Sequence, residues 1–170
     1  NVDGTVDLAE QAIAAGVRRF IFLSSVKVNG ESTEPGRSFA ADDRPSPLGP
    51  YAISKYEAEN KLNLLAAERA LEVVNIRLPL VYGPGVKANF QSLLSLLRAG
   101  IPLPLASIHN LRSLISTENL ADLIIACAQH PAAANKTLMA ADGEDISTPD
   151  LLRKLGRFMG RPARLLAVPV

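Results

Sequence analysis

Phe20-Ile21-Phe22-Leu23 is a short, uninterrupted apolar run, and Ser24-Ser25 follows it directly. Aromatic and β-branched side chains favour extended backbone. A continuous apolar run of this length is typical of a strand that is buried on both faces of a parallel sheet. A second strand is predicted at residues 73–78, where Val73, Val74 and Ile76 are β-branched. The two segments predict neighbouring parallel strands, with Ser25 at the carboxyl end of the first.

The segments around these strands have helical patterns. Apolar residues recur at helical spacing from Val2 to Ala14, and Gly16 then ends the pattern. Residues 29–49 are rich in Gly, Pro, Ser and Asp and predict a long loop. Pro50 suits the first turn of a helix that runs to about residue 70, because its missing N–H needs no partner there. This alternation predicts an α/β fold built from βαβ units around a parallel sheet.

The second half of the chain predicts shorter elements. Pro79, Gly83, Pro84 and Gly85 predict a break after the second strand. The elements expected beyond it are a helix at 90–99, a short strand at 111–115, a helix that Thr117 caps, a weak strand at 137–140 and a final helix at 147–158. We interpret residues 1–84 as a partial Rossmann-like domain and residues 85–170 as part of a small substrate-binding domain.

The composition excludes several classes of function. Lys and Arg number 18 and Asp and Glu number 17, so a net charge of +1 gives no reason to expect nucleic acid as a partner. The single cysteine, Cys127, cannot form an internal disulfide and is expected in the core. The histidines His109 and His130 are too far apart to predict a metal site. No apolar run approaches the ~20 residues of a membrane span, and a cytoplasmic protein is the default expectation.

Tyr51 and Lys55 are four residues apart near the start of the predicted helix, so they share one face. A nearby ammonium favours the ionised phenol, which could then exchange a proton with a substrate hydroxyl. A serine at a neighbouring strand end, such as Ser25, could hydrogen-bond the reacting oxygen. The Tyr-x-x-x-Lys spacing alone is weak, since it also occurs in helices where both residues are solvated, and Ser25 alone could equally be a turn serine.

Five segments in order resemble the extended short-chain dehydrogenase/reductases, the NAD-dependent epimerase/dehydratase family. Their Ser-Ser-x-x-Val-Tyr-Gly segment is similar to Ser24-Ser25-Val26-Lys27-Val28-Asn29-Gly30, and their Tyr-x-x-x-Lys helix start is similar to Pro50-Tyr51-Ala52-Ile53-Ser54-Lys55, with Glu57 and Glu59 following. Their Arg-x-x-x-Val-Tyr-Gly-Pro stretch is similar to Arg77-Leu78-Pro79-Leu80-Val81-Tyr82-Gly83-Pro84. Asn1-Val2-Asp3-Gly4-Thr5 matches their Asn-Val-x-Gly-Thr helix start, and residues 111–115 stand in the place of a substrate-domain arginine segment.

The resemblance implies a role for individual residues. Tyr51 would be the general acid/base, Lys55 its partner and a ligand of the cofactor ribose, and Ser25 the catalytic serine. The other residues implied at the cofactor are Ser24, Pro79, Leu80 and Val81. The residues implied at the substrate are Lys87, Asn89, Phe90 and Arg112. Arg112 would bind the diphosphate of a nucleotide sugar, and its alternative is a surface ion pair.

The resemblance also implies a reaction and its cofactor, NAD or NADP. The first candidate is a UDP-sugar 4-epimerase similar to UDP-glucose 4-epimerase. The alternatives are a nucleotide 4-ketosugar reductase of polysaccharide synthesis and a non-catalytic protein that binds sugar nucleotides. Asn29 stands where the family commonly has tyrosine, which leaves the sugar open.

The Gly-x-x-Gly-x-x-Gly pyrophosphate loop of the family is absent from these residues. We therefore expect the 170-residue chain to be the carboxy-terminal portion of the enzyme, inactive by itself and able to form a homo-oligomer.

Overall fold

The computed structural model describes residues 2–86 and 89–168. The chain forms two compact units: the first runs up to Leu78 and includes Leu120–Ala140, and the second holds Pro79–Asn119 and the residues from Ala141 onward. The chain thus passes between the units at three places. The division into a partial Rossmann-like domain at residues 1–84 and part of a substrate-binding domain at residues 85–170 stays a prediction.

The first unit contains a parallel sheet with the strand order β1-β2-β5. Its strands are β1 (Arg19–Ser25), β2 (Glu72–Leu78) and β5 (Lys136–Met139). Phe20 is paired with Val73, and Ser25 with Leu78, so β1 and β2 end at the same edge. The predicted parallel pairing of these two strands is confirmed. The strand predicted at residues 137–140 is also present and begins one residue earlier, at Lys136.

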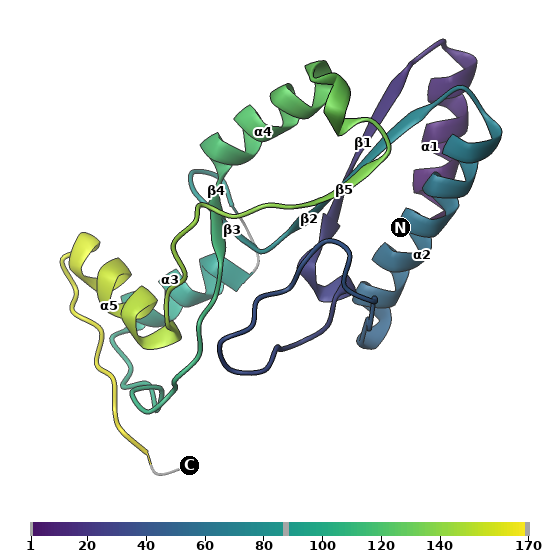
Figure 1. The fold of residues 1–170 in the computed structure, drawn as a ribbon. Helices are drawn as coiled ribbons and strands as arrows, with labels where there is room; N and C mark the ends of the chain where they lie inside the picture. Colours follow the sequence, from purple (N-terminus) through teal and green to yellow (C-terminus); the bar gives the residue numbers. More distant parts are fainter. Residues whose placement is uncertain (1, 87–88, 169–170) are drawn as a thin grey trace. The chain divides into compact units, whose positions relative to one another are not determined.

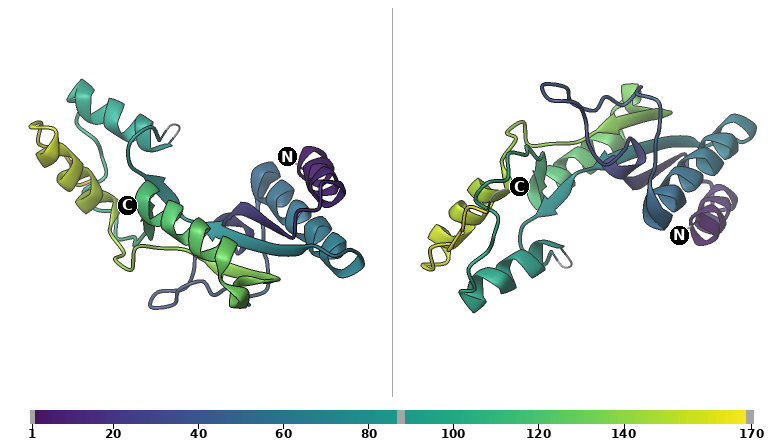
Figure 2. Two further views of the ribbon diagram at one scale, coloured as in Figure 1. Left: turned by 90° about the horizontal axis from the view of Figure 1, so that it is seen from above. Right: turned by 90° about the horizontal axis from the view of Figure 1, so that it is seen from below.

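Helices cover this sheet on both faces. The helices α1 (Val2–Ala14) and α2 (Gly49–Glu68) lie side by side on one face, whereas α4 (Thr117–Gln129), from Leu120 onward, lies on the other (Figures 1 and 2). Short 3-10 turns follow β1 at Val26–Val28 and α4 at Pro131–Ala133. The main apolar cluster joins helices to strands through Ala9, Phe22, Ala58, Leu62, Leu71 and Val73. This arrangement confirms the α/β fold class.

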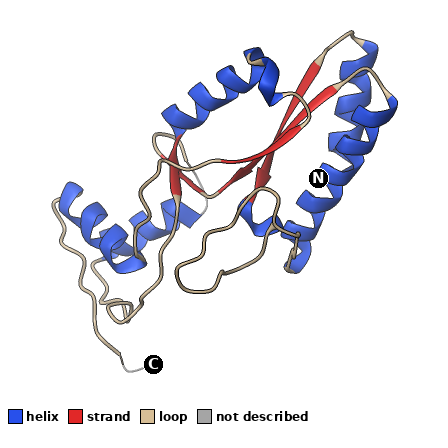
Figure 3. Cartoon of the chain, in the orientation of Figure 1, coloured by secondary structure: helices blue, strands red, loops and turns tan. Residues whose placement is uncertain are grey.

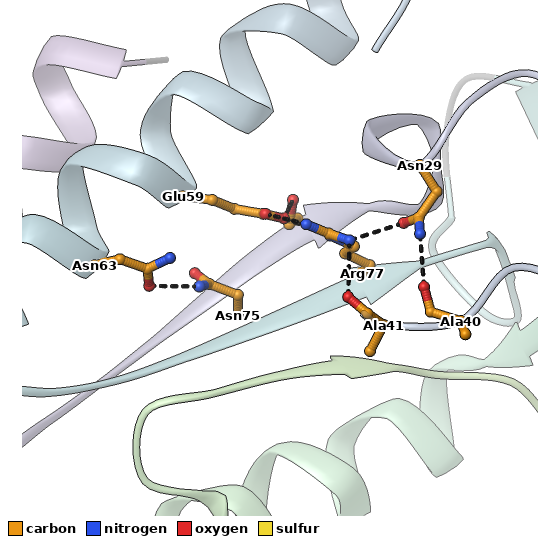
Figure 4. A network of polar contacts seen from close by, with 8 residues as sticks. Asn29, Ala40, Ala41, Glu59, Asn63, Asn75 and Arg77 are labelled. Atoms are coloured by element: carbon orange, nitrogen blue, oxygen red, sulfur yellow. Dashed lines mark hydrogen bonds and ion pairs between the residues drawn. The ribbon is translucent and has the colours of Figure 1, made fainter. Parts of the chain in front are cut away.

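The strand β2 lies between the other two strands, and its five residues 73–77 are all buried. Apolar side chains explain most of this burial, yet Arg77 is only 4% exposed. Its guanidinium forms a two-pronged ion pair with Glu59 of α2, at 3.0 Å from Nε to Oε1 and 2.7 Å from Nη2 to Oε2 (Figure 4). Glu59 is 2% exposed, so the interior of the first unit contains a charge pair.

The second unit is built on a small parallel sheet of β3 (Leu80–Tyr82) and β4 (Leu114–Ser116). The helices α3 (Asn89–Ala99) and α5 (Thr148–Phe158) pack together around Leu97, Leu103 and Leu152. From Pro79 and Gly83, the sequence predicted only a break in this region. The structure has a strand of three residues, β3, between them. The strand predicted at 111–115 begins later, at Leu114, and Arg112 forms an isolated bridge with Ile146 instead.

Asp142 joins several elements of the second unit. Its carboxylate accepts hydrogen bonds from Tyr82 Oη at 2.8 Å, Asn119 Nδ2 at 2.7 Å and the backbone N–H of Ser116. The hydrogen bonds from Asn119, Tyr82 and Ser116 lower the pKa of Asp142 against the opposing effect of burial. The strands β3 and β4 are therefore held to the start of α4 by one ionised side chain.

Removing Arg77 should destabilise the complete protein strongly. In Arg77→Met, Glu59 stays buried without its cation, which typically costs about 3–5 kcal/mol of unfolding free energy. Lys61→Met, on the same helix as Glu59, removes a surface ion pair with Asp3 and should cost less than about 1 kcal/mol. Urea unfolding followed by circular dichroism measures both changes. Equal, small losses in the two variants would contradict a structural role for the buried pair.

Candidate active site

Tyr51 and Lys55 lie in the first two turns of α2. Pro50 occupies the start of this helix, as predicted, and Leu48 precedes it in extended conformation. Tyr51 is 53% exposed, so its phenol is open to a ligand. Glu59 lies four residues after Lys55, on the same face of α2, and belongs to the buried ion pair.

Lys55 reaches the carboxyl end of β1. Its Nζ donates a hydrogen bond to the carbonyl oxygen of Leu23 at 2.9 Å and lies 4.5 Å from the centre of the Phe22 ring. Burial lowers the pKa of Lys55, and the negative charge of Glu59 opposes that shift. The structure therefore brings the ammonium of Lys55 to the strand that ends in Ser25.

The two serines at the end of β1 have different partners. Ser25 is 8% exposed, and its hydroxyl accepts a hydrogen bond from the backbone N–H of Lys27 at 3.2 Å, which caps the following 3-10 turn. Ser24 is also buried and donates its hydroxyl to Glu59 Oε1. Ser24 is thus engaged with α2 through Glu59, whereas the hydroxyl of Ser25 keeps its proton free to donate.

The buried network beneath these residues had no role in the sequence prediction. Arg77 Nη1 donates to Asn29 Oδ1 at 3.0 Å and to the carbonyl of Ala41 at 3.4 Å, and Asn29 Nδ2 donates to the carbonyl of Ala40 at 2.7 Å (Figure 4). A signal was present in the sequence, because an arginine inside a run of buried strand residues needs a buried acceptor. The identity of that acceptor could not be inferred from spacing.

The remaining predicted residues lie in the second unit or outside the described part of the chain. Pro79 follows β2, and Leu80 and Val81 belong to β3, all half-buried. Phe90 is 8% exposed and packs near Tyr82, with ring centres 6.2 Å apart. Asn89 is the first residue of α3, and Lys87 lies outside the described residues.

Arg112 is exposed, and its backbone exchanges two hydrogen bonds with Ile146. Among residues 2–86 and 89–168, its guanidinium has no ion pair or side-chain hydrogen bond. The alternative, a surface ion pair of Arg112, therefore lacks a carboxylate partner in the described part of the chain.

Other predicted features concern metals, membranes and the cysteine. Within the described ranges, no group of three or more His, Cys, Asp or Glu side chains could hold a metal ion. No helix in those ranges is both long and apolar enough to cross a membrane. Cys127 is 3% exposed, as predicted for a core thiol.

A parallel sheet covered by helices on both faces, with Lys55 of α2 reaching the strand that ends in Ser25, is a Rossmann-like arrangement. Residues 1–141 match the NAD dependent epimerase/dehydratase family. The chain belongs to this family.

Relatives and solved structures agree with this assignment. A UDP-glucose 4-epimerase of Vibrio cholerae is 52% identical over 171 residues, which cover 100% of this chain and 52% of the relative. The chain thus spans about half the length of the curated relatives it matches. The structure of MoeE5 in complex with UDP-glucuronic acid and NAD is 26% identical with a TM-score of 0.82, over 100% of this chain and 57% of that one.

A UDP-glucose 4-epimerase from Thermus thermophilus, solved in complex with NAD, shares the fold. The TM-score is 0.81 at 19% identity, over 98% of this chain and 56% of that one.

The lowered pKa of Lys55 predicts a pH effect on stability. Between that lowered pKa and the ordinary value of 10.5, the unfolded chain binds a proton that the folded chain has released. Raising the pH through this window should therefore increase the unfolding free energy of the wild type relative to Lys55→Met. Urea midpoints of both proteins at pH 7 and pH 10 measure the difference. A difference that shrinks or stays constant as the pH rises would contradict the burial of this ammonium.

Proposed function

We propose that this chain is part of an NAD(P)-dependent UDP-sugar 4-epimerase in which Tyr51, Lys55 and Ser25 do the chemistry. One observation carries the proposal: the Lys55 ammonium lies 2.9 Å from the Leu23 carbonyl, at the end of the strand that holds Ser25 and one turn beyond Tyr51. The identity of 52% to the Vibrio cholerae epimerase, along the whole chain, supports the same reaction.

Tyr51 is the proton carrier in this proposal. Its ionised oxygen takes the proton of the sugar 4-hydroxyl as a hydride leaves C4. After the sugar has presented its other face, a hydride is returned to C4 and the Tyr51 phenol gives its proton to the 4-keto oxygen. The positive charge of Lys55 favours the phenolate during the first step. Ser25 donates its free hydroxyl proton to the reacting oxygen and so holds it near Tyr51.

The donor set fits a nicotinamide dinucleotide. After its bond to Leu23, the Lys55 ammonium retains two N–H groups, which suit the hydroxyls of a ribose. Bound NAD or NADP would supply the hydride acceptor and donor. The half-buried Pro79, Leu80 and Val81 are proposed to line the nicotinamide, and Ser24 to support the same edge through Glu59.

The proposed substrate is a nucleotide-diphosphate sugar. An exposed guanidinium with no partner among the described residues is well suited to a diphosphate, because its fork matches two phosphate oxygens. We assign this contact to Arg112 and place Lys87, Asn89 and Phe90 near the substrate. Such substrates and cofactors are soluble, which supports a cytoplasmic location. Exposed Leu8 and Leu64 on the neighbouring helices α1 and α2 support self-association.

Tyr51→Phe in the complete enzyme tests the chemistry. The variant removes the titrating oxygen and keeps the ring, so epimerase turnover should fall by ~10² to 10⁴-fold while the melting temperature changes little. Tyr56→Phe is the matched control, because the helix turns Tyr56 away from the Tyr51–Lys55 face, and its turnover should stay near wild type. If Tyr51→Phe keeps more than about a third of wild-type turnover, the non-catalytic binding function replaces this proposal.

Arg112→Ala tests the diphosphate contact. Loss of a charge-assisted hydrogen bond should weaken sugar-nucleotide binding by about 2 kcal/mol, roughly thirtyfold. Arg157→Ala removes another exposed guanidinium of the second unit and serves as the control. Calorimetry with the UDP-sugar measures both affinities. Equal affinities in the two variants would remove Arg112 from the substrate site.

A further inference from the structure

The side chain of Asn29 is buried and hydrogen-bonded in the interior of the first unit. It lies just after the 3-10 turn that follows Ser25, and it is 4% exposed. Its Oδ1 accepts from Arg77 and its Nδ2 donates to the Ala40 carbonyl, so both ends of the amide are occupied (Figure 4). A sugar would therefore not contact Asn29 directly, although this residue departs from the family pattern.

The contact to Ala40 fixes the middle of a long loop. Residues 30–48 have no helix or strand and connect the turn after β1 to the start of α2 (Figure 3). The carbonyls of Ala40 and Ala41 bind Asn29 and Arg77, and Ser46 N–H donates to the Val28 carbonyl at 3.0 Å. The loop is thus held at two points by the segment that begins with Ser25.

The loop also packs closely on the residue after Asn29. A Cβ built on Gly30, whose φ is +150°, would lie 3.3 Å from the Phe39 ring. Inside the loop, Arg37 pairs with Asp43, and Asp43 accepts from the Ala40 N–H at 2.8 Å. These contacts hold residues 37–43 of the loop together beside Asn29, and the same loop continues to Leu48 at the start of α2.

We infer that Asn29 is a positioning residue for the proposed epimerase reaction. Its amide joins the buried Arg77 to the loop, and it thereby sets the distance between the Ser25 turn and the first turn of α2. Reacting groups that are misplaced by about 1 Å can lose on the order of a hundredfold in rate. The inference rests on the proposed function, and it assigns the effect to turnover and leaves cofactor affinity unchanged.

Two variants of the complete enzyme test this role. Asn29→Leu removes both hydrogen bonds, whereas Asn29→Asp keeps the acceptor for Arg77 and loses the donor to Ala40. Both should lower kcat by roughly 10- to 100-fold, and the dissociation constant of NAD should stay within about twofold. Glu31→Gln is the control, since Glu31 is exposed beside the same turn and pairs with Lys27, and it should leave kcat unchanged.

Trypsin cleavage after Arg37 reports on the loop without relying on activity. Arg37 is exposed within the loop, so release of Ala40 should accelerate its cleavage about tenfold or more in both Asn29 variants. Unchanged cleavage would show that the hydrogen bond from Asn29 to Ala40 does not hold the loop. Accelerated cleavage with wild-type kcat would overturn the positioning role. A parallel loss of kcat and NAD affinity would show a merely structural residue. If Tyr51→Phe is active while cleavage is accelerated in the Asn29 variants, the proposed function fails, but Asn29 still holds the loop.

Discussion

The ion pair between Glu59 and Arg77 constrains the rest of the first unit. Two charges in the interior are costly unless each of their polar atoms has a partner. Glu59 meets this demand with Arg77 and the hydroxyl of Ser24, and Arg77 with Asn29 and the Ala41 carbonyl. The pair therefore fixes α2 on β2, the end of β1 on α2, and the long loop on both. Each of these elements carries or adjoins a residue of the candidate site.

The same pair shapes the electrostatics around Lys55. Burial lowers the pKa of Lys55, and the negative charge of Glu59, which is itself paired with Arg77, opposes that shift. An ammonium that burial disfavours gains from any new acceptor or negative charge near it. In the proposed reaction, that negative charge belongs to Tyr51, one helical turn away. The structural core and the proposed chemistry thus share Glu59.

Much of the first unit could be predicted from the sequence. The apolar run at β1, the β-branched residues at β2, the loop and the Pro50 helix start predicted the parallel pairing, since local composition favours strands and turns. The partners of Arg77 could not be predicted, because Glu59, Asn29 and Ala41 come together only through tertiary packing. The strand β3 was not predicted, because it has only three residues and the strand-breaking residues Pro79 and Gly83 lie directly on either side of it. The burial of Phe90 against Tyr82 is also a tertiary contact that no helical periodicity specifies.

The discontinuous first unit has a consequence for biosynthesis. The ribosome produces β2 long before β5, because β3, α3, β4 and the whole of α4 lie between them in the chain. Until Lys136–Met139 emerges, the outer edge of β2 displays unpaired peptide groups beside its buried apolar side chains. Such an edge can pair with a neighbouring nascent chain. Asn135, whose side chain binds the Val73 N–H at 3.0 Å, completes the sheet as that edge closes. Slow translation through α4 would lengthen this vulnerable interval, whereas a chaperone bound to β2 would protect it.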